Sequence, residues 1–144
     1  MTPKLTPPNL DLFSFSCDLQ IRFSDIDGYM HVNNGVYYSY FEHARALYLY
    51  QTCGWNVMEI GTVVGKTTIE YIKPIHLDDE LSCMVRCTRL GNSSFDLEQL
   101  IMSKKGDGTT ILSKCNTVMV SVDMKTMKPT PIPEAYRSKL LPQG

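Results

Sequence analysis

The segment DIDGYMHVNN, residues 25–34, brings together side chains that can act on a carbonyl group. The carboxylate of Asp25 or Asp27 can attack a carbonyl carbon or activate a water molecule for that attack. Glycine, aspartate and asparagine occur here at the density of a turn, which predicts a loop. Asn33 and Asn34 come just before an expected helix, where unpaired backbone N–H groups and the positive end of the helix dipole collect. A carbonyl oxygen placed there would be polarised, as an oxyanion site requires.

Two regular elements flank this loop. Apolar and polar residues alternate before it with the period of a half-buried strand, and we expect that strand at residues 15–24. After the loop, apolar residues recur at steps of three and four, which predicts a helix over Val36–Cys53 that ends at Gly54. The apolar positions are Val36, Tyr37, Tyr40, Phe41, Ala44, Leu47 and Tyr48, and Ser39, Glu42, His43 and Arg45 largely fill the polar gaps. Since this helix is apolar on more than one side, we expect other elements to cover it.

The chain after the helix is typical of β-strands. Apolar and β-branched runs occupy residues 62–75, interrupted by a proline, and then 81–90, 95–103 and 109–122. The turns LGNSS and KGDG join the last three runs, so we expect antiparallel neighbours and a meander of four strands after the helix. A short helix is expected within residues 131–140. The predicted fold class is therefore α+β, with a curved antiparallel five-stranded sheet wrapped around one long central helix.

Length and composition indicate one folded domain, which we place at residues 13–144, after an extended arm with prolines at residues 1–12. Fourteen lysines and arginines against fifteen acidic residues give a net charge of −1, without the basic excess that binding to nucleic acid requires. The five cysteines include no CxxC pair, and we interpret them as reduced core thiols of a cytoplasmic protein without a metal site. The N-terminus has no apolar stretch, so we expect neither a signal peptide nor a membrane span.

Two longer segments carry a family resemblance. RFSDIDGYMHVNNGVYYSYFEHAR, residues 22–45, resembles the signature of hotdog-fold acyl-CoA thioesterases of the 4-hydroxybenzoyl-CoA thioesterase type, and also resembles acyl-ACP thioesterases. IEYIKPIHLDDEL, residues 69–81, is similar to the second strand of that family and the turn after it. The likeness in element order covers residues 13–122. It implies hydrolysis of an acyl-CoA or acyl-ACP thioester to a carboxylic acid and a thiol in lipid metabolism, with coenzyme A only as part of the substrate and no other cofactor.

The resemblance also assigns roles to residues of the loop. The catalytic carboxylate of the family, a nucleophile or general base, matches Asp27, whereas Asp25 is expected to shape the turn or cap the helix. The oxyanion donor of the family is a backbone amide seven residues after that carboxylate, at Asn34. A histidine at the place of His31 has a catalytic part in the acyl-ACP relatives. Here His31 either contacts the carboxylate or the acyl chain, or fixes the loop through a backbone carbonyl.

Three further residues are candidates for substrate binding. Tyr37 is the helix aromatic nearest the loop, whereas most of the other helix aromatics are expected to be core residues. Asn33 stands beside Asn34, although both side chains also suit a helix N-cap. Tyr29 replaces the asparagine that the acyl-ACP relatives carry two residues after the aspartate, and this departure weakens a plant-type catalytic triad.

The partners and the competing functions follow from the same observations. An exposed sheet edge and the resemblance both predict a homodimer or homotetramer, with the site between two subunits. One alternative is a hotdog protein that binds an acyl thioester without hydrolysing it. Another is a hotdog hydratase or dehydratase, which commonly places its histidine or acid in a different motif. His43 and His76 are expected to be surface or structural residues, since neither is next to another catalytic residue type.

Overall fold

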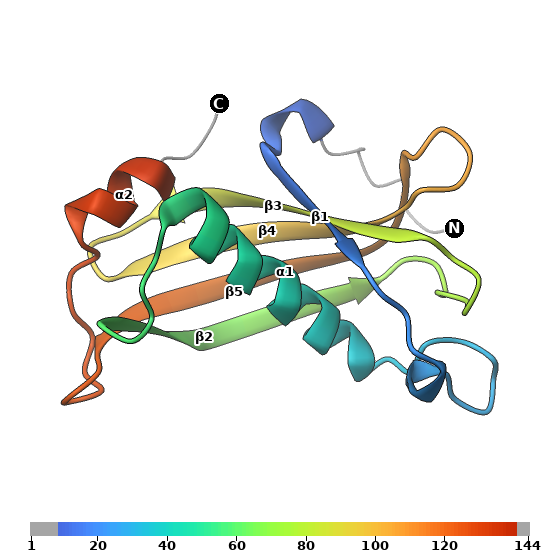
Figure 1. Cartoon of the computed structure of the whole chain (residues 1–144), viewed down its shortest axis with the longest axis horizontal. Helices are drawn as coiled ribbons and strands as arrows, with labels where there is room; N and C mark the ends of the chain where they lie inside the picture. Colours follow the sequence, from blue (N-terminus) through green and yellow to red (C-terminus); the bar gives the residue numbers. More distant parts are fainter. Residues whose placement is uncertain (1–8, 141–144) are drawn as a thin grey trace, which may run out of the picture.

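Five antiparallel strands form one sheet, and one long helix lies across it (Figure 1). The structure, a computed structural model, describes residues 9–140. The strands are β1 (Phe15–Leu19), β2 (Ile60–Tyr71), β3 (Leu81–Leu90), β4 (Ser94–Ser103) and β5 (Thr110–Asp123), and the helices are α1 (Val36–Cys53) and α2 (Glu134–Leu140). Two short 3₁₀ helices, η1 (Leu10–Leu12) and η2 (Phe23–Asp25), lie before α1. The predicted α+β class, with five strands and one long helix, is confirmed.

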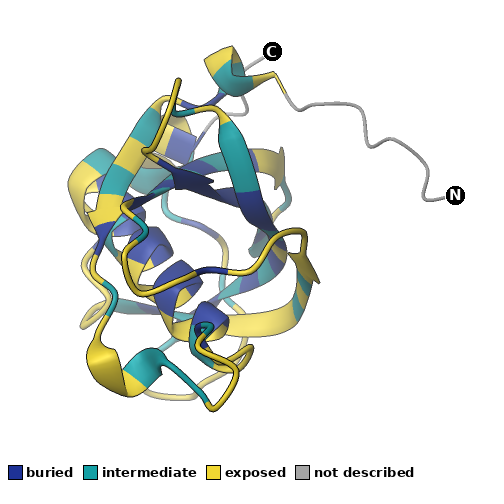
Figure 2. Ribbon diagram, turned by 90° about the vertical axis from the view of Figure 1, so that its right-hand side faces the viewer, coloured by how far each residue is buried: buried dark blue, intermediate teal, exposed yellow. Residues whose placement is uncertain are grey.

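Helix α1 has the bounds that its sequence predicts. Tyr37, Phe41 and Ala44 recur at steps of four and three, and each is at most 2% exposed. Gly54 ends the helix with φ at 65°, a left-handed conformation that glycine adopts easily, and its N–H donates to carbonyls of the last turn. Figure 2 shows the buried part of α1 lying inside the molecule, next to the sheet.

One polar position of α1 differs from the expectation. Arg45 was assigned to a polar gap in the apolar pattern, yet the residue is only 3% exposed. Its guanidinium lies 5.1 Å from the centre of the Tyr38 ring and its Nη2 lies 3.9 Å from an oxygen of Glu42. These two side chains come from the same helix and cover the cation, which the spacing of apolar residues does not reveal.

Strand β4 is buried along most of its length because both of its faces are covered. Leu97 and Ile101 belong to the main core beneath α1. Leu100 and Met102 point to the opposite face, where they pack against Phe13 in a second apolar cluster. The short chain segment before β1 therefore covers the face of the sheet that α1 leaves open.

The arm expected at residues 1–12 is described only in part. Residues 1–8 lie outside the described residues. The expected extended conformation is wrong for Leu10–Leu12, which forms η1, because the side chain of Asn9 accepts a hydrogen bond from the Asp11 N–H and caps this turn.

The first strand is shorter than its alternating pattern predicts. It ends at Leu19 instead of residue 24, since its pairing with β3 stops there. The chain then turns into η2, and Phe23, which continues the apolar alternation, is 81% exposed. The alternation of apolar and polar residues over residues 20–24 therefore does not form a strand, because no neighbouring strand pairs with this segment.

The position of β2 contradicts the expected meander of four strands. β3, β4 and β5 are joined by the two predicted turns and pair in sequence order. β2 instead pairs with β5 at one edge of the sheet, and β1 occupies the place beside β3. β2 also covers Ile60–Tyr71 instead of residues 62–75, so it ends before Pro74. The C-terminal helix α2 is found within the predicted segment.

The five cysteines are free thiols, and all but Cys17 are buried. Burial raises the pKa of Cys53 to about 12 and that of Cys87 to about 11, so these thiols stay protonated at neutral pH. Their interpretation as reduced core residues is confirmed for the four buried thiols. Within residues 9–140, no helix is both long and apolar enough to cross a membrane.

The packing of α1 leads to a stability prediction. Ala44 is fully buried between α1 and the sheet, so Ala44→Phe should overpack this contact and lower the free energy of unfolding by about 1–3 kcal/mol. Ala46→Phe, at an exposed position of the same helix, is the matched control and should have a smaller effect. Urea unfolding followed by circular dichroism measures both. An unchanged midpoint for Ala44→Phe would contradict the buried position of this helix face.

Candidate functional site

Backbone hydrogen bonds fold the loop of residues 25–34 back on itself. The Asp27 N–H donates to the His31 carbonyl at 2.9 Å, and the Asn33 N–H donates to the Asp25 carbonyl at 2.8 Å. Met30 closes the turn with φ at 64°, in the left-handed region, and its N–H donates to the Asp27 carbonyl. The loop is thus a small hairpin, whose backbone hydrogen bonds to His31 and Met30 hold Asp27 within it.

The two aspartates of the loop have different surroundings. One oxygen of Asp25 accepts hydrogen bonds from the Tyr40 hydroxyl at 2.6 Å and from the Arg22 N–H at 2.9 Å. Burial and this bond raise the pKa of Tyr40, so its hydroxyl remains a donor to Asp25. Asp27 accepts one hydrogen bond, from the Tyr29 N–H to Oδ1 at 2.9 Å, and its Oδ2 accepts none from the described residues. Asp25 therefore ties the loop to α1, while Asp27 keeps a carboxylate oxygen available.

The backbone donor of Asn34, just before α1, is unused within the described chain. The side-chain oxygen of Asn33 accepts the Gly35 N–H at 2.8 Å, and its carbonyl accepts the Val36 N–H at 2.9 Å. The N–H of Asn34, the residue between Asn33 and Gly35, donates to no group within residues 9–140. The N-cap residue is Gly35, not either asparagine, so the predicted N-cap assignment is wrong by one or two positions. Asn33 therefore accepts the N–H groups of Gly35 and Val36 from outside the helix and passes over that of Asn34.

A cavity of about 230 Å³ opens beside this helix start. The Tyr71 hydroxyl, from the end of β2, donates to the Asn34 carbonyl at 3.0 Å, and its ring meets the Tyr37 ring edge-on at 4.8 Å. The loop is attached to the next connection through the Val32 N–H, which donates to the Ile75 carbonyl. The lining residues are His31, Val32, Asn34, Tyr37, Tyr71, Ile72, Lys73 and Pro74.

Two histidines contact each other, and one of them, His31, lines the cavity. His31 is partly buried and lines the cavity, and its ring lies 4.8 Å from that of His76 in an edge-to-face contact. The backbones of the two residues form an isolated antiparallel bridge. Asp79 accepts the His76 N–H at 2.8 Å and lies 3.7 Å from His76 Nδ1. His76 is a surface residue, as expected, but the expectation that it lies away from other candidate residues is wrong.

The structure brings together three of the six candidate residues. His31, Asn34 and Tyr37 line the cavity, and Tyr37 is 2% exposed. Burial raises the pKa of Tyr37, with smaller contributions from Tyr71 and Asp79. Asp27, Asn33 and Tyr29 do not line the cavity, and Tyr29 is 82% exposed. The Tyr29 N–H instead donates to the Asp27 carboxylate, and the Asn33 side chain accepts the Gly35 N–H at the helix start.

Sequence reasoning missed Tyr71 and the contact of His76 with His31. Both contacts join segments about 40 residues apart in the chain, and no local spacing reports such a pairing. The hydrogen bond of Tyr71 could have been anticipated only from the pairing of β2. The arrangement offers a free N–H at a helix start, where a carbonyl oxygen is polarised, and a nearby loop carboxylate with a free oxygen.

Comparison with known proteins gives consistent matches. A family model described as the thioesterase-like superfamily matches residues 21–140. Long-chain acyl-CoA thioesterase FadM from Escherichia coli K12 is 30% identical over 125 residues, which cover 85% of this chain and 93% of FadM. Acyl-CoA thioester hydrolase YbgC from Escherichia coli O6:H1 is 26% identical over 125 residues, covering 84% of this chain and 91% of YbgC.

A solved structure shares the fold as well. The crystal structure of a thioesterase from Thermus thermophilus, complexed with coenzyme A and zinc, is 34% identical and has a TM-score of 0.77. The match covers 90% of this chain and 94% of that chain. The family match includes the loop, α1 and the sheet strands from β2 to β5. The chain therefore belongs to the thioesterase-like superfamily and is a thioester hydrolase of the hotdog fold.

Proposed function

We propose that this protein hydrolyses acyl-CoA thioesters at the junction between the loop of residues 25–34 and α1. The observation that carries the proposal is that Asn34, a residue that lines the cavity, has a backbone N–H without an acceptor among the described residues. Two named relatives, FadM and YbgC, are described as acting on acyl-CoA, which favours coenzyme A over acyl carrier protein as the thiol. An acyl-ACP substrate is the second candidate.

In this mechanism the carbonyl oxygen of the thioester accepts a hydrogen bond from the Asn34 N–H. The positive end of α1 adds to the polarisation, and the negative charge that develops on that oxygen is stabilised there. Asp27 either attacks the carbonyl carbon itself or takes a proton from an attacking water molecule. The C–S bond then breaks, the thiol leaves, and water supplies the second oxygen of the carboxylic acid product, directly or by hydrolysis of an acyl-aspartate.

The other candidate residues position this chemistry. The N–H of Tyr29 orients the Asp27 carboxylate, and the side chain of Asn33 takes the Gly35 N–H and so holds the helix start. His31 fixes the Asp27 backbone through its carbonyl and presents its ring to the cavity. Tyr37 forms the wall against which the acyl group would lie. We propose a cytoplasmic location, which the free thiols support.

We also propose that the protein acts as a homodimer or homotetramer. β2 is an edge strand of 12 residues, and its outer backbone groups have no partner strand within the described chain. Val63 and Val64 in its middle are 37% and 36% exposed. A long apolar edge of this kind invites pairing with another strand. A sheet curled around α1, as the family resemblance implies, would let two copies meet along β2.

The first prediction concerns the carboxylate. Asp27→Asn keeps the side-chain volume and removes the charge, so the turnover number for acyl-CoA hydrolysis should fall by about 100-fold or more. Affinity for a non-hydrolysable acyl-CoA analogue should stay within a few-fold. Thiol release measures the rate, and calorimetry measures the binding.

Asp25→Asn is the matched control for this experiment. Asp25 holds Tyr40 and the loop backbone, so its substitution should lower thermal stability and reduce turnover less than Asp27→Asn does. A trivial effect of Asp27→Asn would remove the proposed mechanism. Equal losses in two well-folded variants would mean that the carboxylates act as a pair.

The second prediction concerns assembly. Light scattering at micromolar concentration should give the mass of a dimer or tetramer. Val63→Lys puts a charge on the exposed edge and should shift the mass towards the monomer, whereas Thr109→Lys in the exposed β4–β5 turn should not. A parent protein that is monomeric and fully active would refute the proposed assembly.

A further inference from the structure

The connection between β2 and β3 holds the loop of residues 25–34 from outside. Figure 1 shows both segments at the same end of the molecule. The Val32 N–H donates to the Ile75 carbonyl at 2.8 Å, and the backbones of His31 and His76 form a bridge beside this bond. These contacts use backbone atoms, so a change of side chain at His76 leaves them in place.

The imidazole of His31 depends on a side-chain contact. It lines the cavity, and it makes no hydrogen bond within residues 9–140. Its ring centre lies 4.8 Å from that of His76, and the two ring planes are 84° apart. Aromatic rings favour this edge-to-face arrangement. The direction of the His31 ring therefore follows from packing against His76 and not from hydrogen bonding.

His76 is in turn held by Asp79. The Asp79 carboxylate accepts the His76 N–H at 2.8 Å, and the Asp79 N–H donates to the His76 carbonyl at 3.0 Å, which closes a turn. The same carboxylate oxygen lies 3.7 Å from His76 Nδ1. Lys105, from the turn between β4 and β5, lies 3.6 Å from the other oxygen. Because the Asp79 side chain is only 12% exposed, His76 packs on a firmly held anchor.

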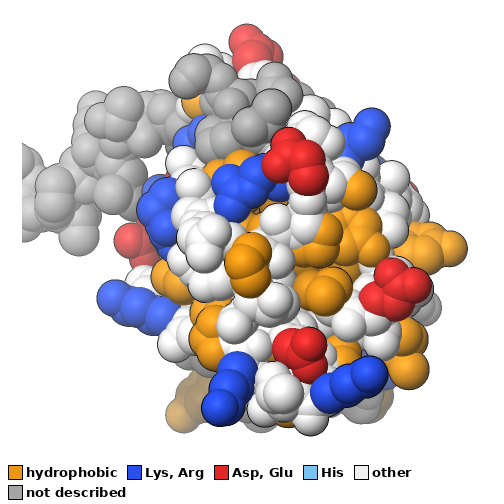
Figure 3. All heavy atoms as spheres, turned by 90° about the vertical axis from the view of Figure 1, so that its left-hand side faces the viewer, with side chains coloured by type: hydrophobic (Ala, Val, Ile, Leu, Met, Phe, Trp, Pro, Cys, Tyr) orange, Lys and Arg blue, Asp and Glu red, His pale blue; other side chains and the backbone are white. Residues whose placement is uncertain are grey.

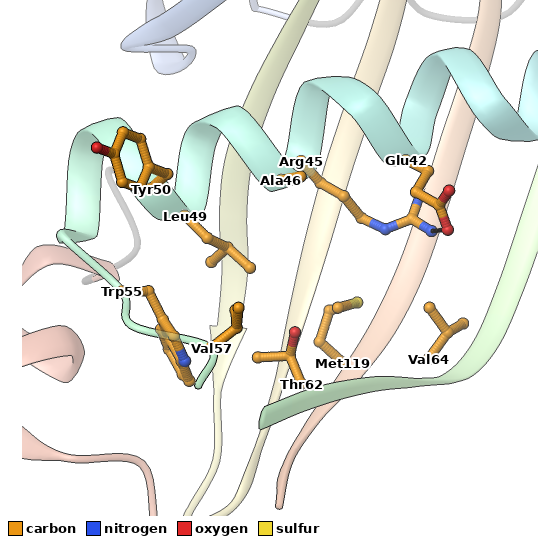
Figure 4. Close-up of a pocket in the computed structure, with 10 residues that line it drawn as sticks. All are labelled: Glu42, Arg45, Ala46, Leu49, Tyr50, Trp55, Val57, Thr62, Val64 and Met119. Carbon is orange, nitrogen blue, oxygen red and sulfur yellow. Dashed lines mark ion pairs between the residues drawn. The ribbon is translucent and has the colours of Figure 1, made fainter. Parts of the chain in front are cut away.

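Other surfaces of the molecule are separate from this contact. Figure 3 shows the end opposite the loop, where hydrophobic side chains gather near the middle and charged side chains surround them. Figure 4 shows the hollow between α1 and β2, and its ten residues include neither His31 nor His76. A His76 variant therefore changes no side chain of this hollow.

We propose that His76 is a positioning residue, whose ring holds the imidazole of His31 at the cavity. A neutral imidazole can donate one hydrogen bond and accept another, so a ring held there can bond the thioester or the leaving thiol. A ring that turns freely reaches that geometry less often, and small misplacements lower reaction rates steeply. The effect on the rate rests on the proposed function, whereas the contact between the rings does not.

Kinetics of two His76 variants test the positioning. His76→Ala removes the ring, so kcat for acyl-CoA hydrolysis should fall by about tenfold while KM stays within a few-fold, because the reacting group is affected more than binding. His76→Phe keeps a ring without nitrogen and should restore kcat to within a few-fold of the parent. His43→Gln, at an exposed position of α1, is the control and should match the parent. Thermal melting checks that each variant is folded.

NMR tests the contact without substrate. The chain has three histidines, His31, His43 and His76, and replacing each by glutamine assigns their ring signals. We expect a nuclear Overhauser effect between ring protons of His31 and His76, since the two rings are in contact. In His76→Phe the same effect should join His31 to the introduced phenylalanine ring.

Three results would overturn the proposal. The first is the absence of this effect between the two rings of the parent, and the second is an unchanged kcat in folded His76→Ala. The third is an equal loss of kcat in His76→Ala and His76→Phe, which would mean that a nitrogen of His76 is needed and its packing is not. If the parent releases thiol from no acyl-CoA, the proposed function fails, and the NMR result alone decides whether His76 holds His31.

Discussion

The start of α1 is the constraint on which the site depends. A helix leaves its first N–H groups without partners inside the helix, and the preceding loop decides which of them stay free. Asn33 accepts the N–H groups of the two residues at the helix start and leaves that of Asn34 unused. Asp25 holds the loop in place through Tyr40, one turn into the helix. The rest of the fold keeps α1 against the sheet, so that this junction has one geometry.

Local patterns predicted the elements whose ends are fixed by local chemistry. The bounds of α1 were found because its apolar spacing is regular and Gly54 ends it in a left-handed conformation. The pairing of β2 was not found, because the choice between β3 and β5 as its neighbour depends on packing across the whole sheet. The predicted strand was too long at Phe23 for a related reason. Alternating apolar residues form a strand only where a partner strand is present.

The residues of the candidate site also fall into two groups: those that local sequence predicts and those that depend on contacts between distant segments. Asp27 and Asn34 were found because a contiguous motif carries both residues and its family resemblance assigns them. Tyr71 and His76 reach the site through contacts between distant segments, which a single sequence does not display. Arg45 was wrongly predicted to face solvent. A prediction from helical spacing assigns every charged residue to the solvent-facing side, although neighbours on the same helix can cover it.

Replacing the amide at Asn34 by an ester tests the account most directly, because this change removes the N–H and leaves the side chain in place. Thiol release from the preferred acyl-CoA should fall by about 100-fold or more, the usual effect of losing one oxyanion donor. Asn34→Ala keeps the N–H and should retain most of the activity. If the ester variant is folded and as active as the parent while Asn34→Ala is inactive, the side chain carries the chemistry and the helix-start amide does not.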